Sequence, residues 1–188
     1  MDLISNPEWT HYLSRKFTDF YKEDYFRAQK ASGGNIDIFL VISDLGGQEG
    51  PMISLEMFDE FIAPYLKELV DRIHDLGAYA MFHSCGMVFP FIERFIDLGL
   101  DILDPIQPIG EEMSPENLAK SFKGKICFHG GIDIQYVLPH GTLEEVQDEV
   151  KHYSEVLGEE GGYICCPAHL FQPDTPPENI IAFYDTRT

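Results

Sequence analysis

Five short apolar runs follow residue 35, and each is followed by a longer segment whose apolar residues recur at helical spacing. Short continuous apolar runs between polar or glycine-containing segments are typical of strands buried on both faces. Their alternation with helical segments predicts five β/α units and a parallel sheet. The runs are IDIFLVIS (36–43), AYAMFH (78–83), DILDPI (101–106), KICFHG (125–130) and GYICCP (162–167).

Polar residues mark where the intervening helices begin. The start signals are Ser54, Ser114 before Pro115, and the capping boxes Thr142–Glu145 and Thr175–Glu178. The first of these helices extends to Gly77, and Pro64 within it predicts a kink or two joined pieces. A further helix is expected over 88–98. Residues 1–35 form a separate lead-in, with an aromatic-rich helix from about Tyr12 to Ala31, ahead of the main domain at 36–188.

Polar or reactive residues stand at the ends of the predicted strands, which favours a TIM (β/α)8 barrel over an open doubly wound sheet. No Gly-x-Gly-x-x-Gly follows the first strand, which argues against a dinucleotide-binding sheet. Five units cannot close an eight-stranded barrel, so we expect a partial barrel. The strand-end residues are Asp44, His83, Cys85, Asp104, His129 and Cys166 or His169.

The 188-residue chain has a formal net charge of −19. So acidic a surface repels phosphate backbones and anionic membranes, so we expect no nucleic acid or membrane partner. No apolar run approaches the roughly 18–20 residues of a membrane helix, and the first residues lack a signal-peptide pattern. Two of the four cysteines are adjacent, unlike a spaced disulfide framework, so we expect a cytoplasmic protein with free thiols.

His83 and Cys85 are the sharpest candidate for chemistry. Residues i and i+2 of an extended segment point to the same side, so an imidazole and a thiol converge just past a strand. Zinc prefers nitrogen and sulfur ligands, and a third would come from the end of the fifth strand, where Cys165, Cys166 and His169 lie. Cys165 and Cys166 point in opposite directions, so only one faces the axis readily.

Two glycine-containing strand ends are candidates for ligand binding. At His129-Gly130-Gly131, the glycines either let the backbone approach a substrate or cofactor or form a plain tight turn. Asp44 likewise either binds substrate or caps a turn. We take Asp44, Asp104 and His129 as candidate catalytic or supporting side chains, from their strand-end position.

At these residues the chain resembles the uroporphyrinogen decarboxylase superfamily, in family order and spacing from about residue 37 to the C-terminus. The resemblance implies a TIM barrel of which this chain holds roughly the last five units. The matching segments are SDLGGQEGPMISLEMFDEFIAPY, HSCGMVFPFIERFIDLGLDILDPIQP, MSPENLAKSF, FHGGIDIQYVLPHGTLEEV and GGYICCPAHLFQPDTPPENI.

The superfamily has two functional branches. One decarboxylates the acetate side chains of uroporphyrinogen without a metal, through an aspartate in an N-terminal motif that is not visible here. The other comprises cobalamin-dependent methyltransferases, in which a His-x-Cys pair and a later Cys bind zinc. That zinc activates a thiol to accept a methyl group from a methylated corrinoid protein. His83 and Cys85 match the pair, so the resemblance favours this branch, with Zn²⁺ and methylcobalamin.

The later ligand departs from the family pattern. At the family's spacing after a Pro-x pair, Pro167-Ala168 is followed by His169 rather than by a cysteine. Either the three zinc ligands are His83, Cys85 and His169, or a local shift of the chain makes Cys166 the third ligand. Two imidazoles and one thiolate give a less electron-rich zinc, so the identity of the methyl acceptor does not carry over.

Three functions follow as hypotheses. The first is a zinc-dependent methyltransferase, with a corrinoid protein or a small molecule as methyl donor. The second is a decarboxylase acting on a tetrapyrrole, although Lys and Arg total only 13. The third is a non-catalytic truncated or split-barrel subunit, whose open edges would be covered by self-association or by a barrel half in trans.

Overall fold

The computed structural model describes residues 2–186 and contains one five-stranded parallel sheet. The strands follow one another in chain order, so each β/α unit lies beside the next. They are β1 (Ile38–Ile42), β2 (Tyr79–His83), β3 (Ile102–Ile106), β4 (Cys127–Ile132) and β5 (Tyr163–Pro167). All five predicted strands are therefore confirmed, and the order is that of a partial TIM barrel.

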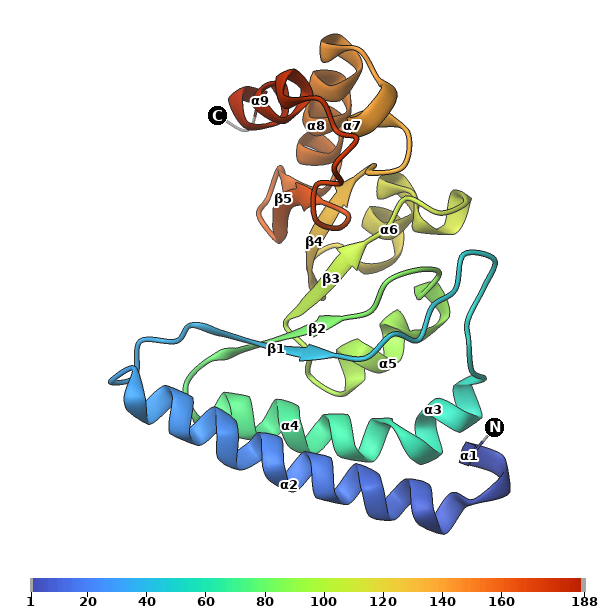
Figure 1. The fold of residues 1–188 in the computed structure, drawn as a ribbon, viewed down its shortest axis with the longest axis vertical. Coiled ribbons are helices and arrows are strands. Elements are labelled where there is room, and N and C mark those ends of the chain that lie inside the picture. The colour runs from blue at the N-terminus through green and yellow to red at the C-terminus, as the bar shows by residue number, and fades with distance from the viewer. Residues whose placement is uncertain (1, 187–188) are drawn as a thin grey trace.

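The helices pack on one side of this sheet, with the N-terminal helices at one end of the molecule and the C-terminal helices at the other (Figure 1). They are α1 (Asp2–Ser5), α2 (Pro7–Ala31), α3 (Leu55–Phe61), α4 (Ala63–Asp75), α5 (Ile92–Asp97), α6 (Pro115–Phe122), α7 (Val137–His140), α8 (Leu143–Gly158) and α9 (Pro177–Thr186). Two 3-10 turns, η1 (Phe89–Phe91) and η2 (Glu111–Met113), precede α5 and α6. None of the helices in residues 2–186 is long and apolar enough to cross a membrane.

Most of the predicted helix signals act as expected. The Ser54 hydroxyl accepts a hydrogen bond from the Met57 amide, and the Thr142–Glu145 capping box is fully formed. Ile62, two residues before Pro64, separates α3 from α4, so the predicted break is real. The second capping box is wrong, because the buried Thr175 hydroxyl has no hydrogen-bond partner among the described residues. The N-terminal helix begins at Pro7 rather than near Tyr12, because proline suits the first turn of a helix.

The core lies between the sheet and its helices. Phe58, Phe91 and Phe95 form a fully buried aromatic group, and Phe82 of β2 contacts Phe95 with the ring centroids 5.0 Å apart. The opposite face of β1 is open, with Ile42 68% exposed. An apolar groove of about 390 Å³ runs between this edge strand and α2. The sheet is thus covered on its helical side and open where a closed barrel would have its interior.

Candidate functional site

The turn after β2 places the first pair of side chains. The buried Ser84 hydroxyl accepts a hydrogen bond from the Leu45 amide at 2.9 Å, and the Gln107 side chain accepts one from the Gly86 amide at 3.0 Å. Gly86 has a φ of 82°, and a Cβ there would lie 2.5 Å from the backbone of the loop after β1. This crossing of two loops requires glycine, and it fixes the direction of His83 and Cys85.

His83, Cys85 and Asp44 point to a common place beyond β1 and β2. The Cys85 sulfur lies 3.4 Å from His83 Nε2, and Asp44 Oδ1 lies 4.0 Å from the same nitrogen. The Asp44 carboxylate also accepts a hydrogen bond from the Cys85 amide at 3.1 Å. Within residues 2–186, these three are the one group of three or more side chains whose potential ligand atoms all lie within 4.8 Å of one another.

Asp104 of β3 holds two imidazoles at once. One oxygen of its carboxylate lies 2.6 Å from His83 Nδ1, and the other lies 2.5 Å from His129 Nδ1. His83 and Asp104 are register partners on adjacent strands, and His129 follows on β4. Because both Nδ1 atoms are engaged by the carboxylate, both rings are left with Nε2 available to other partners.

Burial and hydrogen bonding oppose each other at Asp104. Burial acts to raise the pKa of this carboxyl, and the hydrogen bonds to His129 and His83 act to lower it, with a net shift below the ordinary value. The pKa of His129 is raised to about 9, first by its hydrogen bond to Asp104 and then by one to Cys166. The pKa of the Cys85 thiol is raised by burial and by the charges of Asp44 and Asp104. His129 is therefore a cation at neutral pH, and uncoordinated Cys85 is a neutral thiol.

His83, Asp104 and His129 open onto a cleft of about 240 Å³ at the strand ends, and Asp44 and Cys85 are not among its lining residues. The His169 ring lies against the His83 ring in the cleft wall, with the centroids 6.5 Å apart. Larger hollows of about 490, 390 and 300 Å³ lie away from this cleft. The first is lined by charged residues of α2 and α4, the second is the apolar groove beside β1, and the third is lined by residues near the start of α2. The residues lining the cleft are His83, Asp104, Pro105, His129, Cys166, Pro167, Ala168, His169 and Leu170.

The structure thus gathers most of the residues that the sequence singles out. Asp44, Asp104 and His129 join His83 and Cys85, as their strand-end positions suggest. Cys166 and His169 line the same cleft but stand outside the three-residue group of potential ligands.

The two glycines after His129 have a packing reason. At Gly131 a Cβ would lie 2.6 Å from the Tyr153 ring, and at Gly130 it would lie 2.9 Å from Pro105, with φ near 100° at both. Sequence reasoning missed Ser84 and Gln107, which hold the turn. The signal for Gln107 was available, because it is a polar residue directly after an apolar strand.

Comparison with known proteins fits this architecture. The family model for uroporphyrinogen decarboxylase (URO-D) matches residues 1–188. The uroporphyrinogen decarboxylase of Danio rerio is 26% identical over 187 residues, which cover 97% of this chain and 47% of that protein. The enzyme of the same name from Pseudoalteromonas translucida is 24% identical, over 96% of this chain and 48% of its own length.

A solved structure of a methyltransferase from Methanosarcina mazei superposes with a TM-score of 0.69 and 19% identity. It covers 90% of this chain and 47% of that one, so the chain spans about half the length of the relatives it matches. This likeness shows the fold. With the match over all 188 residues, the chain belongs to the uroporphyrinogen decarboxylase family.

Proposed function

We propose that this protein binds zinc through His83, Cys85 and Asp44 and takes part in methyl transfer from a methylated corrinoid to a thiol or similar acceptor. The observation that carries the proposal is the convergence of a nitrogen, a sulfur and an oxygen donor within 4.8 Å on the ends of β1 and β2. A family that contains both decarboxylases and methyltransferases allows this chemistry.

The spacing of the donors fits the ion. Zinc binds nitrogen at about 2.0–2.1 Å and sulfur at about 2.3 Å in a tetrahedral arrangement, which puts the two donors about 3.5 Å apart. His83 Nε2 and the Cys85 sulfur are separated by 3.4 Å. Asp44 is exposed on a loop, so a small side-chain rotation shortens its 4.0 Å separation from His83. A mixed nitrogen and sulfur donor set selects zinc over magnesium or calcium.

Asp104 supplies the second requirement of such a site. A histidine that binds a metal usually gives its other ring nitrogen to a carboxylate, which fixes the tautomer and the ring orientation. The bond of 2.6 Å between His83 Nδ1 and Asp104 does this, and it leaves Nε2 facing Cys85. His169, whose ring centroid lies 6.5 Å from that of His83, is a further imidazole proposed to complete the ligand set.

Each residue of the proposed site has a separate role. Zinc, when bound, lowers the pKa of a coordinated thiol enough to make it a nucleophile at neutral pH. His83, Cys85 and Asp44 hold the ion, Asp104 orients His83, and the cleft of about 240 Å³ admits a small acceptor. The remaining barrel units and a corrinoid protein are the proposed partners, because this chain spans half the length of its relatives.

A second function, decarboxylation of a tetrapyrrole, is favoured by the names of the two curated relatives. Such a substrate carries several carboxylates, which basic side chains would bind. No Lys or Arg lines the cleft among the described residues. The decarboxylase therefore ranks second, and binding of uroporphyrinogen by the isolated chain in a spectroscopic titration would place it first.

Elemental analysis of protein purified without chelator tests the proposal. We expect about one zinc ion per chain, as for a single tetrahedral site. The ion should be lost in His83→Ala and Cys85→Ala and retained in Cys127→Ala, a matched control on β4 outside the cleft. Retention of zinc by His83→Ala would overturn the site. If the protein binds zinc but does not transfer a methyl group from methylcobalamin to a thiol, the proposed zinc site stands and the proposed methyltransferase activity is rejected.

A further inference from the structure

Gln107 is a buried polar residue directly after β3. It is 8% exposed, and its side-chain oxygen accepts a hydrogen bond from the Gly86 amide at 3.0 Å. A buried polar group requires a protein partner in place of the water that it loses, and the Gly86 amide is such a partner. Gly86 directly follows Cys85, so the side chain of Gln107 joins the end of β3 to the turn that carries a proposed metal ligand.

The backbone pairing between β2 and β3 stops short of this turn. The paired residues end with His83 beside Asp104. The Ser84 amide then donates a hydrogen bond to the Asp104 carbonyl at 2.7 Å, and this is the last backbone hydrogen bond between the two segments among residues 2–186. Cys85 lies beyond it, so the turn is held to the end of β3 by the side chain of Gln107.

Two side chains hold the peptide groups on either side of Cys85. The Asp44 carboxylate accepts a hydrogen bond from the Cys85 amide at 3.1 Å, and Gln107 accepts one from the next amide along the chain. Because a residue has only two soft backbone dihedral angles, holding both flanking peptide groups sets the direction of its side chain. Gly86 does not supply this restraint itself, since glycine adopts many backbone conformations besides its φ of 82° here.

We propose that Gln107 is a positioning residue of the metal site, which holds the Cys85 sulfur 3.4 Å from His83 Nε2 so that one ion can bind both atoms. Asp104 orients the imidazole of His83 from β3 itself. The end of β3 therefore positions both proposed ligands that β2 and its turn provide, without supplying a ligand of its own. This inference rests on the proposed zinc site.

Gln107→Met tests the inference, because methionine is similar in length to glutamine and lacks the side-chain oxygen. Gln29→Met is the matched control. Gln29 on α2 is 7% exposed, its oxygen accepts a hydrogen bond from the Ile36 amide at 3.1 Å, and it is not among the residues that line the cleft. Both variants leave a buried amide without its partner and should unfold at lower urea concentration than the unsubstituted chain. A difference in metal binding between them therefore does not come from lost stability.

Zinc affinity is measured by competition with a chromogenic chelator, and Co²⁺ is the second probe, since its charge-transfer absorption with a thiolate reports binding by Cys85. Gln107→Met should weaken zinc binding by about 10–100-fold, which is the usual effect of losing a group that orients a metal ligand. It should also weaken the sulfur-to-cobalt absorption, whereas Gln29→Met should change neither. If Gln107→Met does not fold, Gln107→Asn serves with the same expected losses, because its shorter side chain withdraws the oxygen from the Gly86 amide.

Each outcome separates this inference from the proposed function. Unchanged zinc affinity and an unchanged cobalt spectrum in Gln107→Met would overturn the inference and leave the zinc site in place. An equal loss of zinc affinity in Gln29→Met would also overturn it, since Gln107 would then act through stability alone. If the unsubstituted chain binds neither zinc nor cobalt, the proposed function and this inference are both rejected.

Discussion

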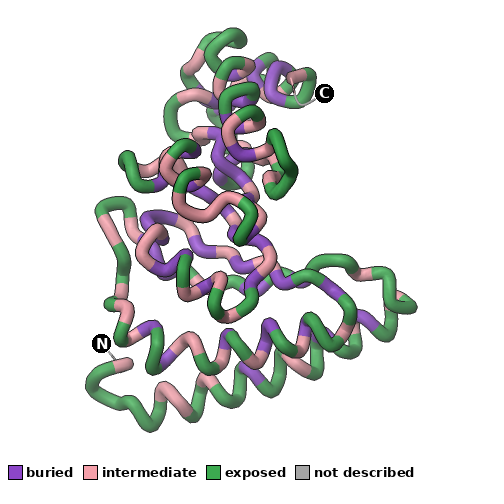
Figure 2. Tube along the Cα trace, turned by 180° about the vertical axis from the view of Figure 1, so that it is seen from behind, coloured by how far each residue is buried: buried purple, intermediate pink, exposed green. Residues whose placement is uncertain are grey.

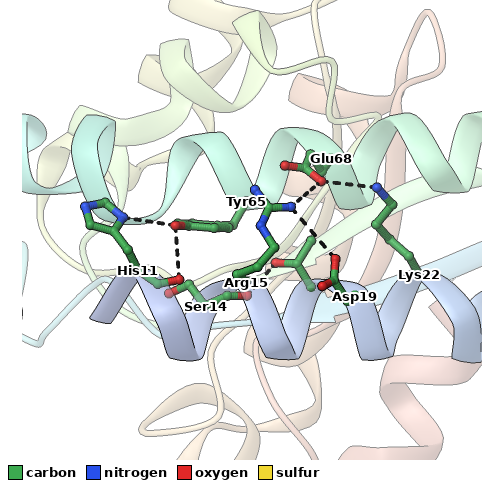
Figure 3. Close-up of polar contacts among 8 residues, drawn as sticks. His11, Ser14, Arg15, Asp19, Lys22, Tyr65 and Glu68 are labelled. Carbon is green, nitrogen blue, oxygen red and sulfur yellow. Dashed lines mark hydrogen bonds and ion pairs between the residues drawn. The ribbon is translucent and has the colours of Figure 1, made fainter. Parts of the chain in front are cut away.

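The α2–α4 helix pair and the strand ends both hold polar side chains together, but they do so in different surroundings. Between the helices, Glu68 of α4 meets Arg15 at 2.8 Å and Lys22 at 3.1 Å from α2 (Figure 3). Each partner there keeps about a third or more of its side chain in solvent. At the strand ends, Asp104 is 13% exposed and binds two histidines. The first arrangement positions a helix, and the second shifts protonation and leaves donor atoms free for chemistry.

The apolar residues of the two regions differ in the same way. Helix α2 carries exposed aromatic side chains, with Trp9 62%, Phe17 60% and Phe20 62% exposed, and Phe17 lines the apolar groove beside β1. Figure 2 shows α2 as largely exposed along its length, whereas β3 and β4 are largely buried. The aromatic side chains behind β2 are fully buried. Stability is therefore concentrated behind the site and is small at the N-terminal helix.

Equal substitutions in the two regions give the largest test of this difference. Phe95→Ala should lower the free energy of unfolding by about 3–5 kcal/mol, because it leaves a cavity among Phe58, Phe82 and Phe91. Phe17→Ala is the matched control and should cost less than about 0.5 kcal/mol, since its ring is already largely in water. Urea denaturation followed by circular dichroism measures both. Similar losses in the two variants would show that α2 is covered in solution.

The next effect concerns the carboxylate that joins the two histidines. Asp104→Asn should weaken zinc binding by about 10–100-fold, since loss of the carboxylate partner of a metal-binding histidine has this effect. This corresponds to about 1.4–2.7 kcal/mol. Competition with a chromogenic chelator measures the affinity. Asp101→Asn is the matched control, because Asp101 contacts His74 at 2.8 Å away from the cleft, and it should leave zinc affinity unchanged.

The sequence predicts the fold well because the fold depends on periodicity. Each apolar run became a strand, and the capping residues at 54, 114 and 142 mark real helix starts. The prediction for Thr175 failed because α9 begins at Pro177, so Thr175 lies one residue before the N-cap position, and its buried hydroxyl has no hydrogen-bond partner among the described residues.

The candidate site was only partly predictable. Strand-end position identified Asp44, Asp104 and His129, because the carboxyl ends of parallel strands share one edge. That one carboxylate binds both histidines, and that Cys166 lines the same cleft as His129, depends on the register of four strands, β2 to β5. Register is not encoded in any local pattern of the chain, so these pairings needed the structure.

Glu149 and Glu68 test how burial and solvent exposure affect a charged side chain, because the pKa of Glu149 is raised and that of Glu68 is lowered. Burial raises the pKa of Glu149 on α8 to about 7, and one of its oxygens has no hydrogen-bond partner among the described residues. An acid whose pKa is raised in the folded state loses stability as pH rises from about 4.5 to 7. Glu149→Gln should therefore stabilise the protein by about 1–2 kcal/mol at pH 8 and have little effect at pH 4.

Thermal unfolding of both forms at the two pH values measures the effect of Glu149. The glutamine oxygen can still accept the hydrogen bond that the Asp133 amide donates at 3.3 Å, so the comparison isolates the charge. Glu144→Gln is the control, because Glu144 lies exposed one turn earlier on α8 and should show no such pH dependence. An equal stabilisation at pH 4 and pH 8 would show that burial of charge is not the cause.

The smallest effect is expected at Glu68, whose pKa is lowered to about 2 by its hydrogen bond to Arg15 and then by Lys22. A lowered pKa means that the stabilisation is present above about pH 4.5 and is lost as pH falls toward 2. Because 32% of the side chain is in solvent, screening limits the contribution, and Glu68→Gln should cost only about 0.5–1 kcal/mol at pH 7. Unfolding in low salt and in 1 M salt measures it, since salt at about 1 M shortens the Debye length to about 3 Å and should remove most of the difference. If Glu68→Gln lowers the free energy of unfolding equally in high salt, Glu68 stabilises the helix pair by packing and not by charge. The difference between the α2–α4 helix pair and the strand ends would then be supported by the aromatic residues alone.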